Sequence, residues 1–206
     1  MDDFEQSWSY SHPFDYIHGR ELEGCIRDHD RLFRQAYQHL KPNGWFEMAS
    51  ISVNVISDDG THKNAIWLEQ SVKYMHESAT IFGKELVSVS TWKERFEKAG
   101  FVNVRQEVLK VSCVNQKGCH RHRRLIARQL PQSPWPKDPK LKELGRYHQV
   151  NMLEAVPIYC YALFTRVLGW KREEIEILLA GVRRDLRDLS NHIYTEVYMI
   201  YGQKPE

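Results

Sequence analysis

The chain has 206 residues, of which 42% are hydrophobic and 27% are charged, and its formal net charge at pH 7 is +2. This composition predicts one globular domain with a buried core and excludes a chain that is disordered throughout. The small net charge excludes a general attraction to acidic partners, so only a local basic cluster could bind one.

The N-terminal residues are acidic and lack the basic and apolar regions of a secretory signal peptide. The longest apolar run, residues 155–164, is too short to cross a bilayer and contains a proline. We therefore expect a soluble protein of the cytoplasm or the nucleus. The four cysteines are then expected to be free thiols: Cys25, Cys113, Cys119 and Cys160.

The first predicted elements are a strand, a helix and a second strand. Phe14–His18 is a short apolar run that is typical of a strand. Asp28 or Asp30 can cap a helix whose apolar residues recur at helical spacing, and the sequence PNG ends it. Trp45–Ser50 then returns as a strand. Such a unit is parallel and right-handed.

Residues 61–100 are predicted to be helical. The segment 64–82 has apolar residues on one helical face, and Thr91 can cap a second helix that Gly100 closes. Residues 101–111 then alternate apolar and polar side chains, which predicts a strand.

A basic insertion is predicted at 112–135, because residues 112–133 have no clear period and no acidic side chain. Its arginines, with Cys113, Cys119, His120 and His122, leave three functions open: a nucleic-acid contact, a nuclear import signal and a metal site. The metal site is disfavoured, because adjacent Cys and His do not form paired ligand arms. A retained intron is a further alternative. Physically, we expect a solvated, mobile loop.

Residues 136–190 are predicted to be mostly helical. Asp138 can cap a long helix, in which Pro157 predicts a kink or a break. The segment 171–189 is a second helix, with its glutamates early and its arginines late, as the helix dipole favours. Residues 192–203 are rich in Tyr, Ile and Val and are predicted to form the last strand.

This order of elements resembles the second half of a class I S-adenosylmethionine-dependent methyltransferase. The segment HLKPNGWFEM carries the L-K-P-x-G turn into strand five of that fold, and AGFVNV precedes strand six. With the further segments DDFEQSW, FDYIHGR, LFTRVLGW and VYMIYGQKP, the chain is identified as a member of the fungal LaeA-like methyltransferases. That family is tied to secondary metabolism and its regulation. The resemblance covers nearly the whole chain apart from the basic insertion.

The resemblance implies an α/β fold: an incomplete, Rossmann-like class I methyltransferase domain with strands four to seven and an inserted helical lid. The last strand should be antiparallel and lie beside strand five. We expect one partial domain over residues 1–206, made of a strand four to strand five unit (1–50), helices (61–100), strand six (101–111), the basic insertion (112–135), the helical lid (136–190) and strand seven (192–203).

The family's cofactor loop is not found in this sequence. Class I methyltransferases carry a glycine-rich acidic loop after strand one and an acidic residue at the end of strand two, which bind S-adenosyl-L-methionine. The eleven glycines of this chain include no G-x-G, and predicted strand four already begins at Phe14. The sequence therefore predicts a truncated cofactor site and leaves open whether the chain is active.

Cofactor-binding candidates come from the N-terminal segment DDFE, which matches the family segment after strand three. The resemblance implies that Asp3 binds the adenine amino group, with Asp2 as the second candidate and the Phe4 backbone amide as a contact to the ring. The alternative is a merely exposed acidic N-terminus.

His18 is the candidate catalytic base. It stands at the C-terminal end of predicted strand four, where parallel sheets bind ligands, and imidazole groups titrate near neutral pH. The alternative is a polar residue that only caps the strand end. The neighbouring Arg20 and Glu21 are interpreted as a surface pair.

Glu47, Trp67 and Tyr74 are candidates for the acceptor pocket. Glu47 follows from its place near the end of strand five, and the two aromatic residues follow from their place on the next helix. Aromatic residues at helical spacing are also typical of a core, which is the alternative.

The leading hypothesis is an S-adenosylmethionine-dependent methyltransferase-like protein of fungal secondary metabolism or its regulation. The alternatives are a noncatalytic interaction protein and an inactive fragment. An exposed edge of strand four predicts a protein partner or self-association. We expect no metal, no membrane partner and no nucleic-acid partner, and the acceptor, a small molecule or a protein, is not specified by the sequence.

Overall fold

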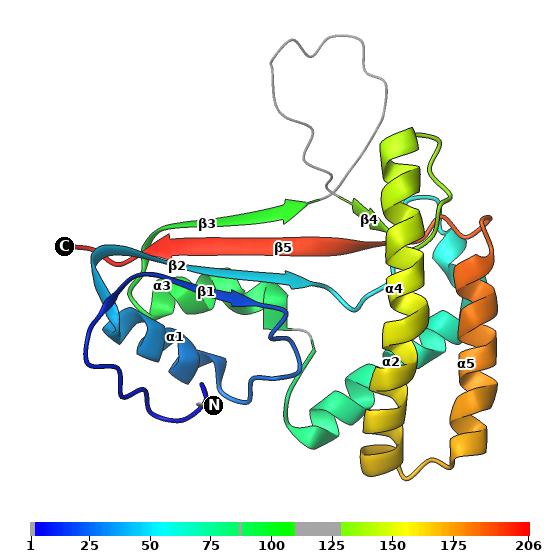
Figure 1. Cartoon of the computed structure of the whole chain (residues 1–206), viewed down its shortest axis with the longest axis horizontal. Coiled ribbons are helices and arrows are strands. Elements are labelled where there is room, and N and C mark those ends of the chain that lie inside the picture. The colour runs from blue at the N-terminus through cyan, green and yellow to red at the C-terminus, as the bar shows by residue number, and fades with distance from the viewer. Residues whose placement is uncertain (1–2, 87, 110–128) are drawn as a thin grey trace. The chain divides into compact units, whose positions relative to one another are not determined.

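The computed structural model describes residues 3–86, 88–109 and 129–206 (Figure 1). They form two compact units. The first comprises Met1–Ser52, Ala79–Glu107 and Tyr198–Glu206, and the second comprises Val53–Ser78 and Val108–Val197. The expected α/β fold is confirmed, whereas the expectation of one domain stays a prediction.

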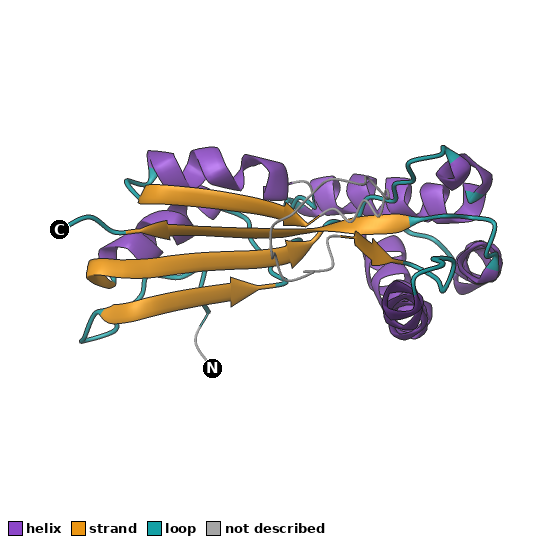
Figure 2. Ribbon diagram, turned by 90° about the horizontal axis from the view of Figure 1, so that it is seen from above, coloured by secondary structure: helices purple, strands orange, loops and turns teal. Residues whose placement is uncertain are grey.

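A mixed sheet has the strand order β1-β2-β5-β3. β1 and β2 are parallel, and His18 stands opposite Glu47 in their register. Figure 2 shows the strands side by side, and in Figure 1 β5 runs against its neighbours β2 and β3. The predicted place of the last strand, antiparallel beside the strand at 45–50, is therefore confirmed. The strands are β1 (Phe14–Arg20), β2 (Leu40–Ile51), β3 (Val102–Leu109), β4 (Gln129–Pro131) and β5 (Tyr194–Gln203).

β2 begins earlier than the sequence predicts. The PNG segment, expected to be a turn before Trp45, lies inside β2, and Asn43 adopts φ 64°. The backbone of Asn43 donates to the Lys204 carbonyl (3.0 Å), and Lys204 donates back to the Gly44 carbonyl (2.9 Å). These residues thus bind the C-terminal tail, a partner that a local pattern does not reveal.

The first unit contains α1 (His29–Gln38), η2 (Ser88–Thr91) and α3 (Trp92–Lys98). Asp28 caps α1, because its carboxylate accepts from the Arg31 amide at 2.8 Å. Asp30, the alternative cap, instead accepts from Arg95 of α3 at 2.8 Å. The core of this unit consists of Ile26, Leu32, Phe33, Ala36, Leu40, Phe46, Met48, Val89, Trp92, Phe96, Phe101 and Ile200.

The two faces of the first unit's sheet differ along β2. Phe46 and Met48 belong to the buried core, whereas Trp45 and Glu47 are only half-buried. Because successive side chains of a strand point to opposite faces, Trp45 and Glu47 lie on the face away from this core.

The second unit is mainly helical. α4 starts at its predicted cap, where Asp138 accepts from the amides of residues 140 and 141. Pro157 does not break α4, so the predicted break is wrong, whereas the alternative of a kink stays a prediction. Val156 and Cys160 on either side are buried, and this packing supports the helix across the missing N–H. The helices are η1 (Thr61–Asn64), α4 (Pro139–Leu163), the π-helical η3 (Phe164–Leu168) and α5 (Arg172–Arg187), with α2 (Ile66–Phe82) extending into the first unit.

The end of the predicted loop is ordered. β4 pairs with β5, and Gln132 and Ser133 are buried, so the expectation of a solvated loop is wrong for these residues. Residues 110–128 lie outside the described residues, with Cys113, Cys119, His120 and His122, and the functions proposed for them stay predictions. Cys25 and Cys160 are free thiols, as predicted. No helix in the described ranges is long and apolar enough to span a membrane.

Candidate functional site

Tyr16, His18 and Glu47 form a polar cluster on the face of the sheet away from the core. His18 Nδ1 lies 3.1 Å from Glu47 Oε1, and the Tyr16 hydroxyl lies 3.4 Å from the same ring nitrogen. The His18 and Glu47 side chains are 39% and 23% exposed, so both can meet a ligand. The parallel register of β1 and β2 produces this contact, because it sets the two residues opposite each other.

The contact with Glu47 fixes the orientation of the His18 ring. A carboxylate only accepts hydrogen bonds, so we assign the proton of neutral His18 to Nδ1, which leaves the lone pair on Nε2. Burial raises the pKa of Tyr16, and the nearby Glu47 carboxylate raises it further, so the phenol stays protonated. Tyr16 was not among the residues predicted from the sequence; its place two residues before His18, on the same strand face, was the available signal.

Glu21 follows directly after β1 and is a further acidic group near this strand end. Its φ of 54° is unusual for a residue other than glycine. Burial raises the pKa of its carboxyl, opposed by hydrogen bonds from the Ile51 amide (3.4 Å) and the Ser50 hydroxyl (3.5 Å). Glu21 thus contacts the end of β2. The positive charge of Arg20, its expected partner, also lowers the pKa of the Glu21 carboxyl.

Asp3 and Phe4 lie in a turn at the start of the described chain. The Asp3 carboxylate accepts from the Glu5 amide at 2.9 Å and from Gln6 Nε2 at 3.5 Å. Phe4 packs against the core, and its carbonyl accepts from Trp8 Nε1 at 2.9 Å. Asp3 is exposed and retains acceptor capacity, since a carboxylate can accept about four hydrogen bonds. Asp2 lies outside the described residues.

Trp67 and Tyr74, two turns apart on α2, line one cavity of about 230 Å³ in the second unit. Trp170 and Glu174 line it as well. The two predicted aromatic residues therefore share a pocket, whereas Glu47 belongs to the first unit.

Comparison with known proteins identifies the family. Residues 1–106, half of the chain, match the sequence profile of a family described as "Methyltransferase domain". The chain belongs to this methyltransferase family. The strands expected as four, five, seven and six of its fold are β1, β2, β5 and β3 in the observed order.

Relatives of this chain include fungal proteins. It is 34% identical to methyltransferase pytC of Aspergillus terreus over 100% of the chain and 57% of pytC. It is 24% identical to the secondary metabolism regulator LAE1 of Cochliobolus heterostrophus, over 99% of the chain and 61% of that protein. The predicted LaeA-like resemblance is thus confirmed. The chain spans about three-fifths of the length of these relatives.

Among solved structures, the chain is similar to phosphoethanolamine N-methyltransferase 2 of Haemonchus contortus in complex with S-adenosyl-L-methionine. The identity is 16% and the TM-score 0.41, with 94% of this chain and 34% of that chain covered.

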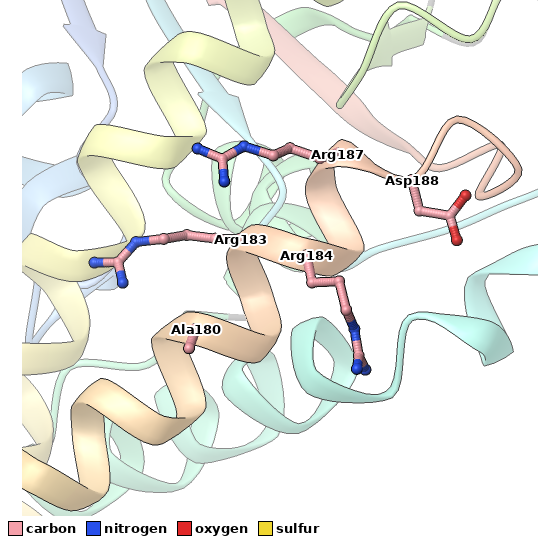
Figure 3. Close-up of a pocket in the computed structure, with 5 residues that line it drawn as sticks. All are labelled: Ala180, Arg183, Arg184, Arg187 and Asp188. Carbon is pink, nitrogen blue, oxygen red and sulfur yellow. The ribbon is translucent and has the colours of Figure 1, made fainter.

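A cationic hollow on α5 of the methyltransferase-family chain is lined by Arg183, Arg184, Arg187 and Asp188 (Figure 3). Arg183 and Arg187 extend to one side of the helix, and Arg184 and Asp188 point elsewhere. Arg183 lies 3.5 Å from Glu176, and Arg184 lies 3.8 Å from Asp185. Two of the three arginines therefore pair with carboxylates, and all three lie near the C-terminal end of α5. We infer that these arginines stabilise the helix, since the helix dipole favours positive charge at this end, as predicted from the sequence.

Proposed function

We propose that this chain takes part in S-adenosyl-L-methionine-dependent methyl transfer in fungal secondary metabolism or its regulation, with His18 as general base. The membership in the methyltransferase family and the names of its fungal relatives support this proposal. The single observation that carries the catalytic part is the His18–Glu47 pair on two adjacent parallel strands, in the C-terminal half of each, and open α/β sheets bind ligands toward that end.

In this proposal His18 Nε2 accepts the proton of an acceptor hydroxyl or amine. Glu47 holds the ring through Nδ1 and stabilises the imidazolium that forms, which is the general role of a carboxylate behind a catalytic histidine. Glu47 is therefore a positioning residue. Its contact differs from the pocket-lining role expected from the sequence, which stays a prediction.

The residues present fit the adenine end of S-adenosyl-L-methionine. An adenine amino group is a hydrogen-bond donor, and the exposed Asp3 carboxylate is an acceptor with unused lone pairs. When bound, this cofactor supplies the methyl group. Asp3 would hold the adenine amino group, with the Phe4 amide as the second contact.

Cofactor binding is the first test. Isothermal titration of the purified chain with S-adenosyl-L-methionine should show saturable binding, and Asp3→Ala should weaken it about tenfold, the effect of losing one charge-assisted hydrogen bond. Asp15→Ala is the matched control, since Asp15 is an exposed carboxylate that pairs with Lys41 at 2.8 Å. A folded chain that does not bind the cofactor would refute the proposal for this chain.

The role of Glu47 can be tested without a known acceptor. The ring nitrogen shifts of His18, measured by NMR above pH 8, should show the proton on Nδ1 in the native chain and a mixture of tautomers in Glu47→Gln. An unchanged tautomer in this variant would remove Glu47 as the group that orients the base.

A second candidate function is protein binding through the edge strand β1. β1 ends the sheet order, and Tyr16 on this strand is 53% exposed. Edge strands with free backbone groups and exposed apolar side chains favour pairing with another chain. Sedimentation velocity should then show concentration-dependent self-association that Tyr16→Lys reduces. Tyr147→Lys is the control and should not reduce it, because Tyr147 is also exposed, at 70%, but lies on α4 and not on the edge strand. A monomer at all concentrations would exclude self-association and leave only a different protein as partner.

A further inference from the structure

The cavity between α2 and α5 has a wall of three aromatic rings. Trp67 and Tyr74 come from α2, and Trp170 stands just before α5. The Trp170 ring meets Tyr74 edge to face, with centroids 4.6 Å apart, and lies 5.3 Å from the buried Phe164. Gln70 also lines the cavity and donates to the Tyr74 hydroxyl at 3.1 Å. The rings are therefore held in place by their neighbours.

The backbone around these rings is also specific. Gly169 adopts φ 70° at the end of η3, and the Trp170 amide donates to the Phe164 carbonyl at 3.0 Å, which turns the chain back toward α2. At the other end, Trp67 packs on Gly181 of α5, where a side chain would collide with its ring. The contacts of Trp170 with Phe164 and of Trp67 with Gly181 thus fix the two ends of the cavity between α2 and α5.

The charge of the lining is one-sided. Glu174 is the one charged residue that lines the cavity, within the part of the chain that the structure describes, and no Lys or Arg lines it. One Glu174 oxygen accepts from the Lys171 amide at 2.8 Å, which orients the carboxylate. Aromatic faces carry partial negative charge, so rings and carboxylate together favour a cation with an apolar surface.

The size and access of the cavity narrow the class of ligand. A volume of about 230 Å³ is below the range of about 300–1,000 Å³ that is usual for sites of drug-sized ligands, so it suits one head group. Ile177 at its border is 64% exposed, so the cavity opens to solvent. A compact, methylated ammonium group meets both conditions, whereas an anion would be repelled by the Glu174 carboxylate.

We propose that the cavity formed by Trp67, Tyr74, Trp170 and Glu174 is a binding site for an alkylated ammonium group, such as a trimethylammonium head. The site is independent of the proposed methyl transfer, because all four residues belong to the second unit and none is part of the His18–Glu47 pair.

The test uses a matched pair of ligands on the full chain without cofactor. Choline and its neutral carbon isostere, 3,3-dimethylbutan-1-ol, differ chiefly in charge, so a cation site should bind choline about tenfold more tightly. Titrations are followed by isothermal calorimetry and by the indole N–H signals of Trp67 and Trp170 in NMR spectra. Equal affinity for the two compounds, or no shift of these signals, would overturn the proposal.

Two variants test the residues. Glu174→Gln keeps an acceptor for the Lys171 amide and removes the charge, and Trp170→Leu keeps apolar bulk and removes the ring; each should weaken choline binding about fivefold. Trp45→Phe, in the first unit, should leave it unchanged. If the Trp170→Leu variant does not fold, Glu174→Gln still tests the proposal, because Glu174 is exposed and its substitution should not unfold the chain. An unchanged affinity of Glu174→Gln for choline would contradict the proposal. Loss of choline binding with intact cofactor binding would not affect the proposed methyl transfer.

Discussion

At the scale of single residues, His29 shows how burial changes a titration. The residue is 6% exposed in the first unit, next to Phe33. Burial, together with the positive charge of Arg95, lowers its pKa from 6.5 to about 4. The folded state therefore holds His29 neutral at pH values where the unfolded chain would protonate it.

The stability of the fold should consequently depend on this histidine in mildly acidic solution. Because the folded pKa lies below the unfolded one, its contribution is complete above about pH 6.5 and is lost as the pH falls toward 4. Between pH 7 and pH 5, His29 should reduce the free energy of unfolding by roughly 2 kcal/mol. Urea unfolding at pH 7, 6 and 5 measures this loss.

His29→Gln is the comparison for that experiment. Burial also lowers the pKa of His76 and His148, so the native chain should lose more stability than His29 alone explains. In His29→Gln, the loss of unfolding free energy between pH 7 and pH 5 should be smaller by the roughly 2 kcal/mol that His29 contributes. An identical loss in both chains would show that His29 does not titrate as described.

Gly181 is a second residue whose role depends on one contact. A Cβ atom at this position of α5 would lie 2.2 Å from the Cγ and Cδ2 atoms of Trp67, closer than real contacts permit. Gly181→Ala should therefore destabilise the fold by about 1–3 kcal/mol, although alanine favours a helix. Denaturant unfolding of Gly181→Ala, and of the same change in a Trp67→Leu background, measures the effect. The second substitution should remove most of the penalty, and an equal penalty in both backgrounds would locate the strain elsewhere.

At the scale of elements, the helices are capped in two ways. Asp28 and Asp138 cap α1 and α4 from within their own segments, as the sequence predicts. α2 is capped from α5: the buried Asp185 carboxylate accepts from the amides of Trp67 (2.8 Å) and Leu68 (3.1 Å), at a separation of 118 residues from Trp67. This remote cap ties the two helices together and keeps the aromatic cavity in shape.

Removing the remote cap should cost more than removing a local one. Asp185→Ala leaves the buried Leu68 amide without its acceptor and should lower the free energy of unfolding by about 2–3 kcal/mol, against about 1 kcal/mol for Asp138→Ala. Both values come from urea unfolding at pH 7. Equal losses would mean that water replaces the Asp185 carboxylate at the start of α2.

At the scale of the whole molecule, the two compact units share elements. β5 continues from the second unit into the first after Val197, and α2 does so after Ser78. A continuous helix and a continuous strand couple the segments on both sides of such a boundary, because hydrogen-bonded structure forms cooperatively. The units are therefore expected to unfold together.

This expectation predicts a single unfolding transition. The midpoints measured by far-ultraviolet circular dichroism and by the NMR signals of Trp45 (first unit) and Trp170 (second unit) should coincide. Two separated midpoints would instead indicate two independent domains. The same measurement tests the expectation of one domain that the sequence supports.

The sequence by itself determined the kinds and order of most elements. Helical spacing, caps and alternation predicted α1, α3, α5, β3 and β5, because these patterns report local backbone preference and the side that faces a core. The motif around Pro42 indicated the family, and with it the place of the last strand beside β2. His18 and Glu47 could be named as candidates because the sequence predicts strands that end near them, although β1 continues to Arg20 and β2 to Ile51.

Only the tertiary structure decided which side chains meet. The parallel register brings His18 to Glu47 and adds Tyr16, and the helix packing brings Trp170 to Tyr74 and Asp185 to Trp67. Hydrogen bonds with Lys204 of the C-terminal tail also hold residues 43 and 44 in β2, and packing keeps α4 helical through Pro157. The reason is physical: contacts between distant segments depend on burial and register, and these arise from the packing of the chain as a whole.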